Sequence, residues 1–294
     1  MAISKVRAQI NGTWYTLTLS GTNTYTATIT APGSTSFTKT GGYYDVTVEA
    51  TNTAGSISTQ TAAGLAGLKL YVREKVPPVI TIISPSAGAY VSNNKQTITF
   101  TVVDETGGSG VDFASVAVKV DGVAVSGVGR VSNTQFSYTP PTALSDGNHT
   151  VTIYASDNDG NKAVEKSITF KVDTIPPTLN ISAPVNELVT NTASLVLRGN
   201  TNDASTSPVT VKITLGGADQ GAVTVGGDGT FTKTLTLKEG VNTIVVTATD
   251  SAGKASSVTR TATLDTSLPA IKSATISPNP VDAGASMVIS VVVE

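Results

Sequence analysis

Side chains that could carry out acid–base or nucleophilic chemistry are few in this sequence. His149 is the only histidine among 294 residues, and there is no cysteine. A Ser-His-Asp hydrolase needs a histidine as its general base. His149, however, stands in a short segment whose two counterparts elsewhere in the chain carry Tyr44 and Asn242 at the same place, and neither residue can replace a catalytic base. We therefore interpret His149 as a residue that hydrogen-bonds across a corner of the fold, and the sequence predicts a protein that is not an enzyme.

Oxygen-bearing side chains alternate along 157–161, as they do in a calcium-binding loop. An EF-hand loop needs glycine at its sixth position and glutamate at its twelfth, but here those positions are Lys162 and Thr169. The simpler interpretation is a hairpin turn stabilised by Asx side chains. The alternative is a Ca²⁺ ion at a junction between domains, with no other cofactor expected. Its candidate ligands are Asp104, Glu105, Asp157, Asp159 and Asp173.

The only tryptophan, Trp14, is the aromatic residue best placed to contact a partner. Residues 13–19 alternate in character, so that Tyr15, Leu17 and Leu19 share one face of a strand while Trp14 lies on the other. An exposed tryptophan can stack on a sugar ring or anchor a protein interface. The sequence therefore predicts a partner contact at Trp14, and the alternative is a tryptophan packed at a seam between domains or under a loop.

Composition excludes two classes of partner. The formal net charge is -2, and the 19 basic residues are scattered rather than clustered, which argues against binding to nucleic acid phosphates. No apolar run reaches the roughly 18 to 20 residues of a membrane span. The first residues also lack the apolar core of a signal peptide. Either a signal lies outside this sequence or the protein does not use one.

An internal repeat predicts the architecture. Three segments, 42–55, 147–160 and 240–253, align without gaps. Each begins with glycine, continues with Val or Ile at alternate positions, and ends in an Asn/Asp-x-x-Gly turn. Alternation with period two indicates a strand with one buried face, and the turn motif indicates a hairpin. We interpret each segment as the penultimate strand of an immunoglobulin-like sandwich, a fold of about 100 residues.

Proline pairs mark the boundaries between the repeats. Pro-Pro occurs at 77–78 and 176–177, and Leu268-Pro269 opens a final segment. We predict an all-β chain of three tandem immunoglobulin-like β-sandwiches with a short C-terminal β segment, arranged as an extended rod because short proline-bearing linkers are stiff. The expected divisions are 1–75, 76–173, 174–266 and 267–294.

The segment 267–294 is too short for a sandwich and is expected to hold two strands. Its last strand is apolar, and an unpaired apolar strand is prone to aggregation. It must pair with the third domain, pair with another chain, or belong to an incomplete fourth repeat. Pairing with another chain would be strand addition to an open sheet edge. The residues expected to make that contact are Met287, Ile289, Val291 and Val293.

Several motifs resemble the bacterial Ig-like (Big-type) repeats of cell-surface proteins and phage structural proteins. They are the Asp-Thr-Ile-Pro-Pro linker at 173–177, the Ala-Thr-Asp-Ser-Ala-Gly turn at 248–253, and Gly-Ser-Gly-Val-Asp at 108–112. The resemblance covers 76–266 well and 1–75 more loosely. The two ends, 1–14 and 276–284, look most like tail-associated Ig-like proteins of phages and prophages.

The resemblance implies a structural or binding role on a virion, or at the cell surface or outside the cell. The expected function is a phage tail-associated or other virion surface component used in decoration or adhesion, with protein partners bound by strand pairing or self-assembly and cell-surface carbohydrate as a further ligand. Two alternatives are a bacterial adhesin or stalk and an accessory module of a polysaccharide-active enzyme. Fold alone does not choose among them.

Overall fold

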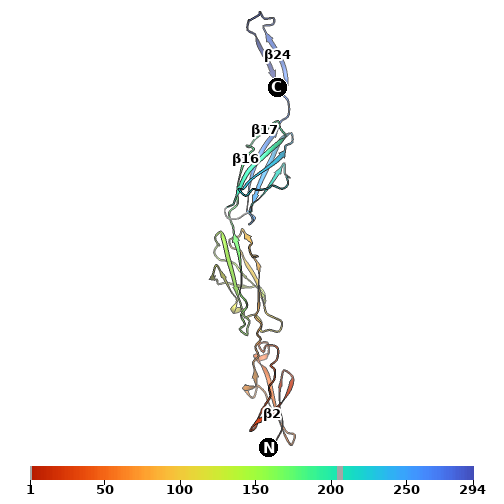
Figure 1. The fold of residues 1–294 in the computed structure, drawn as a ribbon, viewed down its shortest axis with the longest axis vertical. Helices are drawn as coiled ribbons and strands as arrows, with labels where there is room; N and C mark the ends of the chain where they lie inside the picture. Colours follow the sequence, from red (N-terminus) through yellow and green to blue (C-terminus); the bar gives the residue numbers. More distant parts are fainter. Residues whose placement is uncertain (1, 204–207) are drawn as a thin grey trace. The chain divides into compact units, whose positions relative to one another are not determined.

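The computed structural model describes residues 2–203 and 208–294, and its regular secondary structure is almost entirely β-strand (Figure 1). The all-β prediction is confirmed. The chain divides into two compact units, Met1–Val172 and Asp173–Glu294. The first unit contains the first two predicted segments except for Asp173, which begins the second unit together with the other two segments. No helix in the described residues is long and apolar enough to cross a bilayer.

The first segment consists of six strands joined edge to edge in one sheet. The order is β3-β2-β1-β4-β5, and β6 pairs with β4. Its β1–β2 hairpin turns at Asn11-Gly12, where both residues have positive φ (47° and 82°), as the favoured two-residue hairpin turn requires. The bounds are β1 (Ile3–Ile10), β2 (Thr13–Gly21), β3 (Thr24–Thr26), β4 (Tyr44–Asn52), β5 (Ile57–Gln60) and β6 (Lys69–Leu70).

The second segment is a two-sheet sandwich. One sheet has the order β11-β10-β14-β15-β8 and the other β12-β13-β9-β7. The bounds are β7 (Val79–Ser84), β8 (Tyr90–Val91), β9 (Ile98–Val103), β10 (Ala117–Val120), β11 (Val123–Ala124), β12 (Gly129–Arg130), β13 (Gln135–Tyr138), β14 (Gly147–Tyr154) and β15 (Lys166–Val172).

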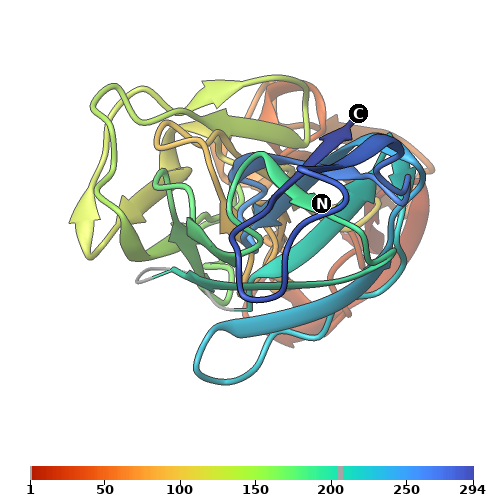
Figure 2. The same ribbon diagram turned by 90° about the horizontal axis from the view of Figure 1, so that it is seen from above.

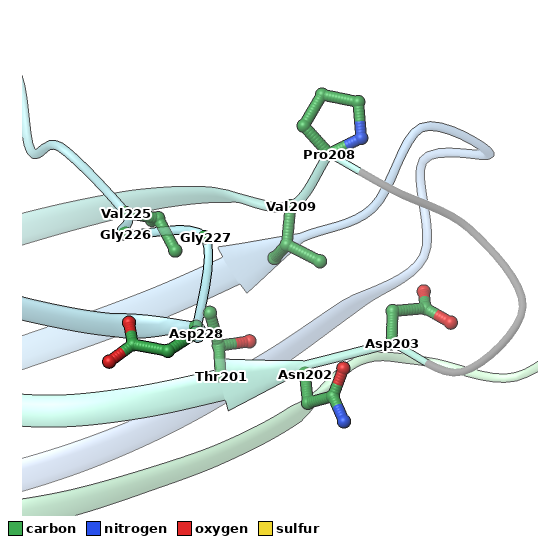
Figure 3. A pocket seen from close by; sticks show the side chains of 10 residues that line it. Thr201, Asn202, Asp203, Pro208, Val209, Val225, Gly226, Gly227 and Asp228 are labelled. Carbon is green, nitrogen blue, oxygen red and sulfur yellow. The ribbon is translucent and has the colours of Figure 1, made fainter.

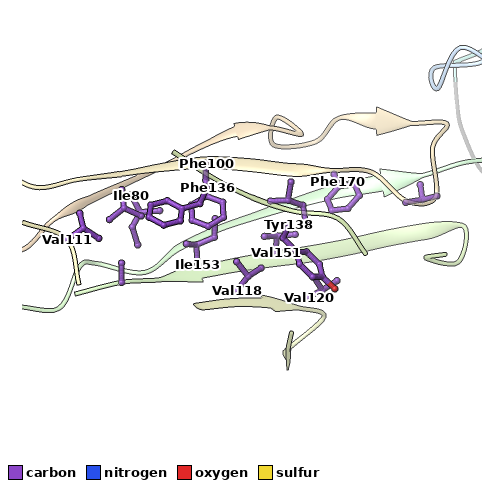
Figure 4. Close-up of a cluster of buried hydrophobic side chains, with 14 residues drawn as sticks. Ile80, Phe100, Val111, Val118, Val120, Phe136, Tyr138, Val151, Ile153 and Phe170 are labelled. Atoms are coloured by element: carbon purple, nitrogen blue, oxygen red, sulfur yellow. The ribbon is translucent and has the colours of Figure 1, made fainter. Parts of the chain in front are cut away.

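The core of the second segment lies between its two sheets (Figure 4). On β9, Ile98, Phe100 and Val102 are fully buried while the threonines between them point outward. Phe100 stacks on Phe136 of the neighbouring strand, with ring centroids 5.6 Å apart. Burying side chains of this size contributes roughly 1.5–3 kcal/mol each, so the period-two pattern specifies which face of each strand turns inward.

The third segment repeats the same plan. A sheet β16-β18-β21 faces a sheet β17-β23-β22-β19-β20, and β18 alternates between exposed and buried residues along its whole length. The bounds are β16 (Thr178–Ala183), β17 (Leu188–Thr190), β18 (Ser194–Asn202), β19 (Thr210–Leu215), β20 (Ala218–Asp219), β21 (Thr230–Thr236), β22 (Gly240–Thr249) and β23 (Ala255–Leu264).

The repeated sequence segments correspond to β4, β14 and β22. Each pairs in antiparallel fashion with the strand that follows it, namely β5, β15 and β23. In the second and third segments, these hairpins form the middle of the larger sheet. The Asn/Asp-x-x-Gly motif therefore lies at the turn of this hairpin, as the sequence predicts.

The C-terminal residues form an antiparallel hairpin of β24 (Ile271–Ser277) and β25 (Val288–Val293), drawn in dark blue in Figure 1 and Figure 2. It is a two-stranded sheet of its own. Among the described strands, none of the third segment pairs with this hairpin. Of the three alternatives for 267–294, pairing with the third domain is therefore not observed.

Candidate functional site

Acidic and amide side chains connect the first segment to the second, within the first compact unit. The carboxylate of Asp159 accepts hydrogen bonds from Thr35 Oγ1 (2.6 Å) and from the backbone N–H of Glu74 (3.0 Å). Asn161 Nδ2 donates to the Glu74 carbonyl (3.1 Å), and Ser109 Oγ donates to Glu74 Oε1 (3.1 Å). We call this contact region the seam. It holds the end of the first segment against two loops of the second.

The turn after β14 positions Asp159 and Asn161 for these contacts. Asp157 is 2% exposed and organises the turn. Its Oδ1 accepts from the Asn161 backbone N–H (2.8 Å), and its Oδ2 accepts from Asn161 Nδ2 (2.7 Å). Burial by itself raises the pKa of Asp157, but hydrogen bonds from Asn161, together with those involving Glu74 and Gly160, outweigh burial and hold that pKa below its ordinary value. The Asx-stabilised turn expected for 157–161 is what the structure contains.

Three carboxylates converge beside the seam. Oxygens of Glu74, Asp104 and Glu105, one from each residue, lie within 4.8 Å of one another. Asp104 Oδ2 accepts from the Gly110 backbone N–H (2.7 Å), whereas Asp104 Oδ1 and Glu105 Oε2 are buried without a hydrogen-bond partner. Burial raises the pKa of Glu105, and the neighbouring Asp104 and Glu74 carboxylates raise it further. Such a group can share a proton or hold a hard cation through its oxygens.

The five predicted calcium ligands do not form one cluster. Asp104 and Glu105 lie together, and Glu74 is the third member that the sequence interpretation missed. Asp157 and Asp159 serve the turn and the seam instead. Asp173 belongs to a different group in the second unit, with Asp203 and Asp250. A signal for Glu74 was present, because Glu74 and Asp173 both stand three residues before a Pro-Pro pair.

His149 makes the corner hydrogen bonds that the sequence predicts. It is 6% exposed, its Nδ1 lies 2.7 Å from Asp121 Oδ2, and its Nε2 lies 2.8 Å from the Ser145 carbonyl. Asn242 in the third segment likewise bonds to the backbone four residues earlier, donating to the Lys238 carbonyl (2.7 Å). Burial lowers the pKa of His149, but the Ser145 carbonyl and the Asp121 carboxylate raise it above its ordinary value.

Trp14 lies half-buried on β2. One side of its ring is covered by the Arg7 guanidinium, 4.0 Å from the ring centroid, and Arg7 in turn pairs with Glu49 (2.6 Å). These contacts are all within the sheet of the first segment. The part of the ring that stays accessible is available to a partner, which remains a prediction.

The third sandwich has a pocket of about 430 Å³ at one end (Figure 3). Thr201, Asn202 and Asp203 form one side, and Pro208 and Val209 lie across from them. The loop 225–229 completes the lining. Its described residues include two carboxylates, Asp203 and Asp228, so the pocket can offer oxygen ligands and hydrogen bonds.

Two segments match known families. Residues 86–174 match the family described as bacterial Ig-like domain, and residues 177–266 match the family described as glucodextranase, domain B. No curated protein matches the chain. With the two-sheet fold of both segments, these matches indicate that residues 86–174 and 177–266 form two tandem Ig-like modules.

Solved structures with related folds include three multi-domain chains. The fibronectin(III)-like modules of Clostridium thermocellum CbhA are 19% identical, with 63% of this chain and 94% of that chain covered and a TM-score of 0.44. A solved chain from a structural study of a 1.5-MDa bacterial ice-binding adhesin is 19% identical, with 90% of this chain and 88% of that solved chain covered (TM-score 0.30). The FN1-FN3 domains of chicken CNTN1 are 13% identical over 88% and 91% (TM-score 0.33).

Proposed function

We propose that this chain is a non-catalytic structural and binding protein that acts outside the cell, as a phage tail-associated or other virion surface component. The observation that carries the proposal is the C-terminal hairpin, which presents an apolar surface and open strand edges. The Ig-like modules would then extend from the attachment point and present their side faces.

Strand β25 carries exposed apolar side chains on both of its faces. On β25, Ile289, Val291 and Val293 are 60%, 51% and 61% exposed, and Met287, just before the strand, is 50% exposed. The intervening Val288 and Val292 are 64% and 56% exposed. A two-stranded hairpin is at best marginally stable alone in water, and contiguous exposed apolar surface marks an interaction site. Pairing with a strand of another chain would extend the sheet and cover these side chains.

The test is to fractionate a lysate after prophage induction on a density gradient and to blot phage-sized particles and envelopes for this protein. We expect co-migration with particles, and we expect Val291→Lys to release the protein because a charge at the pairing strand opposes burial. Thr259→Lys, which places the same charge at an exposed position of β23, is the matched control and should stay with particles. Retention of the wild-type chain on envelopes would reject the virion role in favour of a surface adhesin or stalk.

A second candidate is an accessory module of a polysaccharide-active enzyme. It is favoured by the match of residues 177–266 to glucodextranase domain B. Its test is affinity electrophoresis of the chain through gels containing dextran or starch. Retardation relative to a gel without polysaccharide would support it, and loss of retardation in Trp14→Ala would place the contact at the accessible side of the Trp14 ring. Equal mobility in all gels would reject it.

A further inference from the structure

The second acidic group, Asp173, Asp203 and Asp250, occupies positions in the repeat that correspond to those of Glu74, Asp104 and Asp157. Asp173 precedes its Pro-Pro pair by three residues, as Glu74 does. Asp203 directly follows β18, as Asp104 directly follows β9. Asp250 aligns with Asp157 in the repeated hairpin segment. Two of these three positions contribute to an acidic group in both modules. The third member is Asp250 in the third module, whereas it is Glu105, not Asp157, in the second.

The geometry of this group is compact. One carboxylate oxygen from each of Asp173, Asp203 and Asp250 lies within 4.8 Å of the others. Asp173 is fully buried and Asp250 is 6% exposed, while Asp203 is partly exposed beside the pocket of Figure 3. Three negative charges this close repel one another, and burial strengthens that repulsion because the surrounding dielectric is low.

Asp250 has an unused oxygen in this group. Its Oδ1 accepts from the backbone N–H groups of Ala252 and Lys254, both at 2.8 Å. Its Oδ2 is buried and has no hydrogen-bond partner. A buried carboxylate oxygen without a partner is strongly unfavourable, so a ligand at this position would have a clear energetic role.

In the second module, the corresponding carboxylate oxygen has a hydrogen-bond partner within the protein. There, Asp157 Oδ2 accepts from Asn161 Nδ2 at 2.7 Å. In the third module, Lys254 stands at the position that corresponds to Asn161. Its backbone N–H still caps Oδ1, but the amide side chain is gone, and within the described residues the Lys254 ammonium forms no ion pair with Asp250.

We infer that Asp173, Asp203 and Asp250 bind a divalent cation with the oxygen preference of calcium. Ca²⁺ takes six to eight oxygen ligands, with carboxylates foremost and carbonyls or water for the rest. A doubly charged ion would cancel most of the repulsion within the triad and would give Asp250 Oδ2 a partner. The site goes beyond the proposed function, since it needs neither a virion nor a polysaccharide.

The test uses the full chain, stripped with a chelator and titrated with CaCl₂ alone. Binding is followed by calorimetry, and hydrogen exchange of peptides covering 248–254 reports where the ion binds. We expect Ca²⁺ to increase protection of these peptides. Asp250→Asn keeps the Oδ1 cap but removes the charge, and it should weaken this binding at least about tenfold. Asp203→Asn, just after the end of strand β18, should weaken binding in the same way. It provides a second test in case Asp250→Asn folds poorly.

Two control variants make the outcome decisive. Asp219→Asn removes an exposed carboxylate from the same module and should leave the titration unchanged. Asp104→Asn removes a carboxylate from the other acidic group, formed with Glu74 and Glu105, and should leave protection of 248–254 unchanged. If Ca²⁺ does not alter exchange at 248–254, or if Asp250→Asn and the wild-type chain respond alike, the inference is wrong. Neither result bears on the density-gradient test of the proposed function.

Discussion

The imidazole of His149 lies between two hydrogen-bond acceptors, the Asp121 carboxylate and the Ser145 carbonyl. A carbonyl and an ionised carboxylate can only accept, so both ring nitrogens must carry hydrogen to satisfy both contacts. The charged form of His149 is therefore favoured in the folded state, and its pKa is raised. The structure uses this residue to join the loop before β14 to the end of β10.

The raised pKa of His149 predicts how stability depends on pH. Because the folded pKa lies above the unfolded value of about 6.5, the stabilisation is fully present below that value and is lost as pH rises through the folded pKa. We expect unfolding of the second module by urea to become easier by roughly 1 kcal/mol between pH 6 and pH 9. In His149→Asn, which copies Asn242, this dependence should be absent. An identical pH dependence in both proteins would show that His149 does not titrate in this way.

At the residue scale, the sequence alone could predict the role of His149 but not the acidic groups. The slot shared by His149, Tyr44 and Asn242 follows from a local repeat, and local repeats are visible in sequence. Glu74 meets Asp104 only because the seam brings a linker against a loop, and such proximity depends on tertiary packing. The sequence does show that Glu74 and Asp173 are equivalent, because each stands three residues before a Pro-Pro pair. Only the folded chain shows that both residues lie next to other carboxylates.

At the scale of elements, β18 shows how closely the strands of the third module pack. Gly199 lies between β16 and β21, paired with Ile181 on one side and Phe231 on the other. A Cβ at this position would lie 2.5 Å from the Phe231 ring and 2.7 Å from the Asn180 carbonyl oxygen. Only glycine allows this approach, because both distances are shorter than contacts that real Cβ atoms make.

Gly199→Ala should therefore destabilise the third module by about 1–3 kcal/mol, as overpacking of a core does. Gly227→Ala is the matched control, because a Cβ there meets no atom within 4 Å and surface changes usually stay within about 0.5 kcal/mol. Thermal unfolding of the full chain followed by calorimetry separates the modules. A similar shift for both variants would mean that the close approach at Gly199 relaxes without loss.

The strands were predictable where apolar residues alternate strictly, as on β14 and β22. The pattern is weaker in the first segment, where Leu19 and Ile57 are 63% and 59% exposed. The described strands of this segment form one sheet with no second sheet facing it, so alternation along a strand does not produce a fully buried face there. Pairing across that sheet is set by hairpin turns such as Asn11-Gly12 and by long-range register, and only the turns are encoded locally.

At the scale of the whole molecule, the seam is the feature that turns separate modules into one unit. The first compact unit contains both the first and the second segment. The hydrogen bonds between them cross from Thr35 and Glu74 to Asp159 and Asn161. Polar contacts of this kind are directional, so they favour one orientation of the two segments, whereas a flexible linker would permit many.

We expect the seam to protect the linker around Glu74 from cleavage by trypsin. Arg73 and Lys75 are exposed trypsin sites on either side of Glu74, yet cleavage needs the linker to leave its contacts, because a protease binds an extended, unpaired segment. Replacing Asp159 with Asn and Thr35 with Val removes the 2.6 Å charge-assisted bond, worth roughly 1.5–3 kcal/mol.

The double variant should therefore be cut at Arg73 and Lys75 about tenfold faster or more than the wild-type chain, when cleavage follows the open population. Fragments are identified by mass spectrometry after short digestion, and Asp282→Asn, an exposed carboxylate in the C-terminal hairpin loop, serves as the control. Equal cleavage rates in all three proteins would mean that the proline-bearing linker alone resists the protease. In that case the hydrogen bonds between Asp159 and the first segment would not be what holds the two segments together.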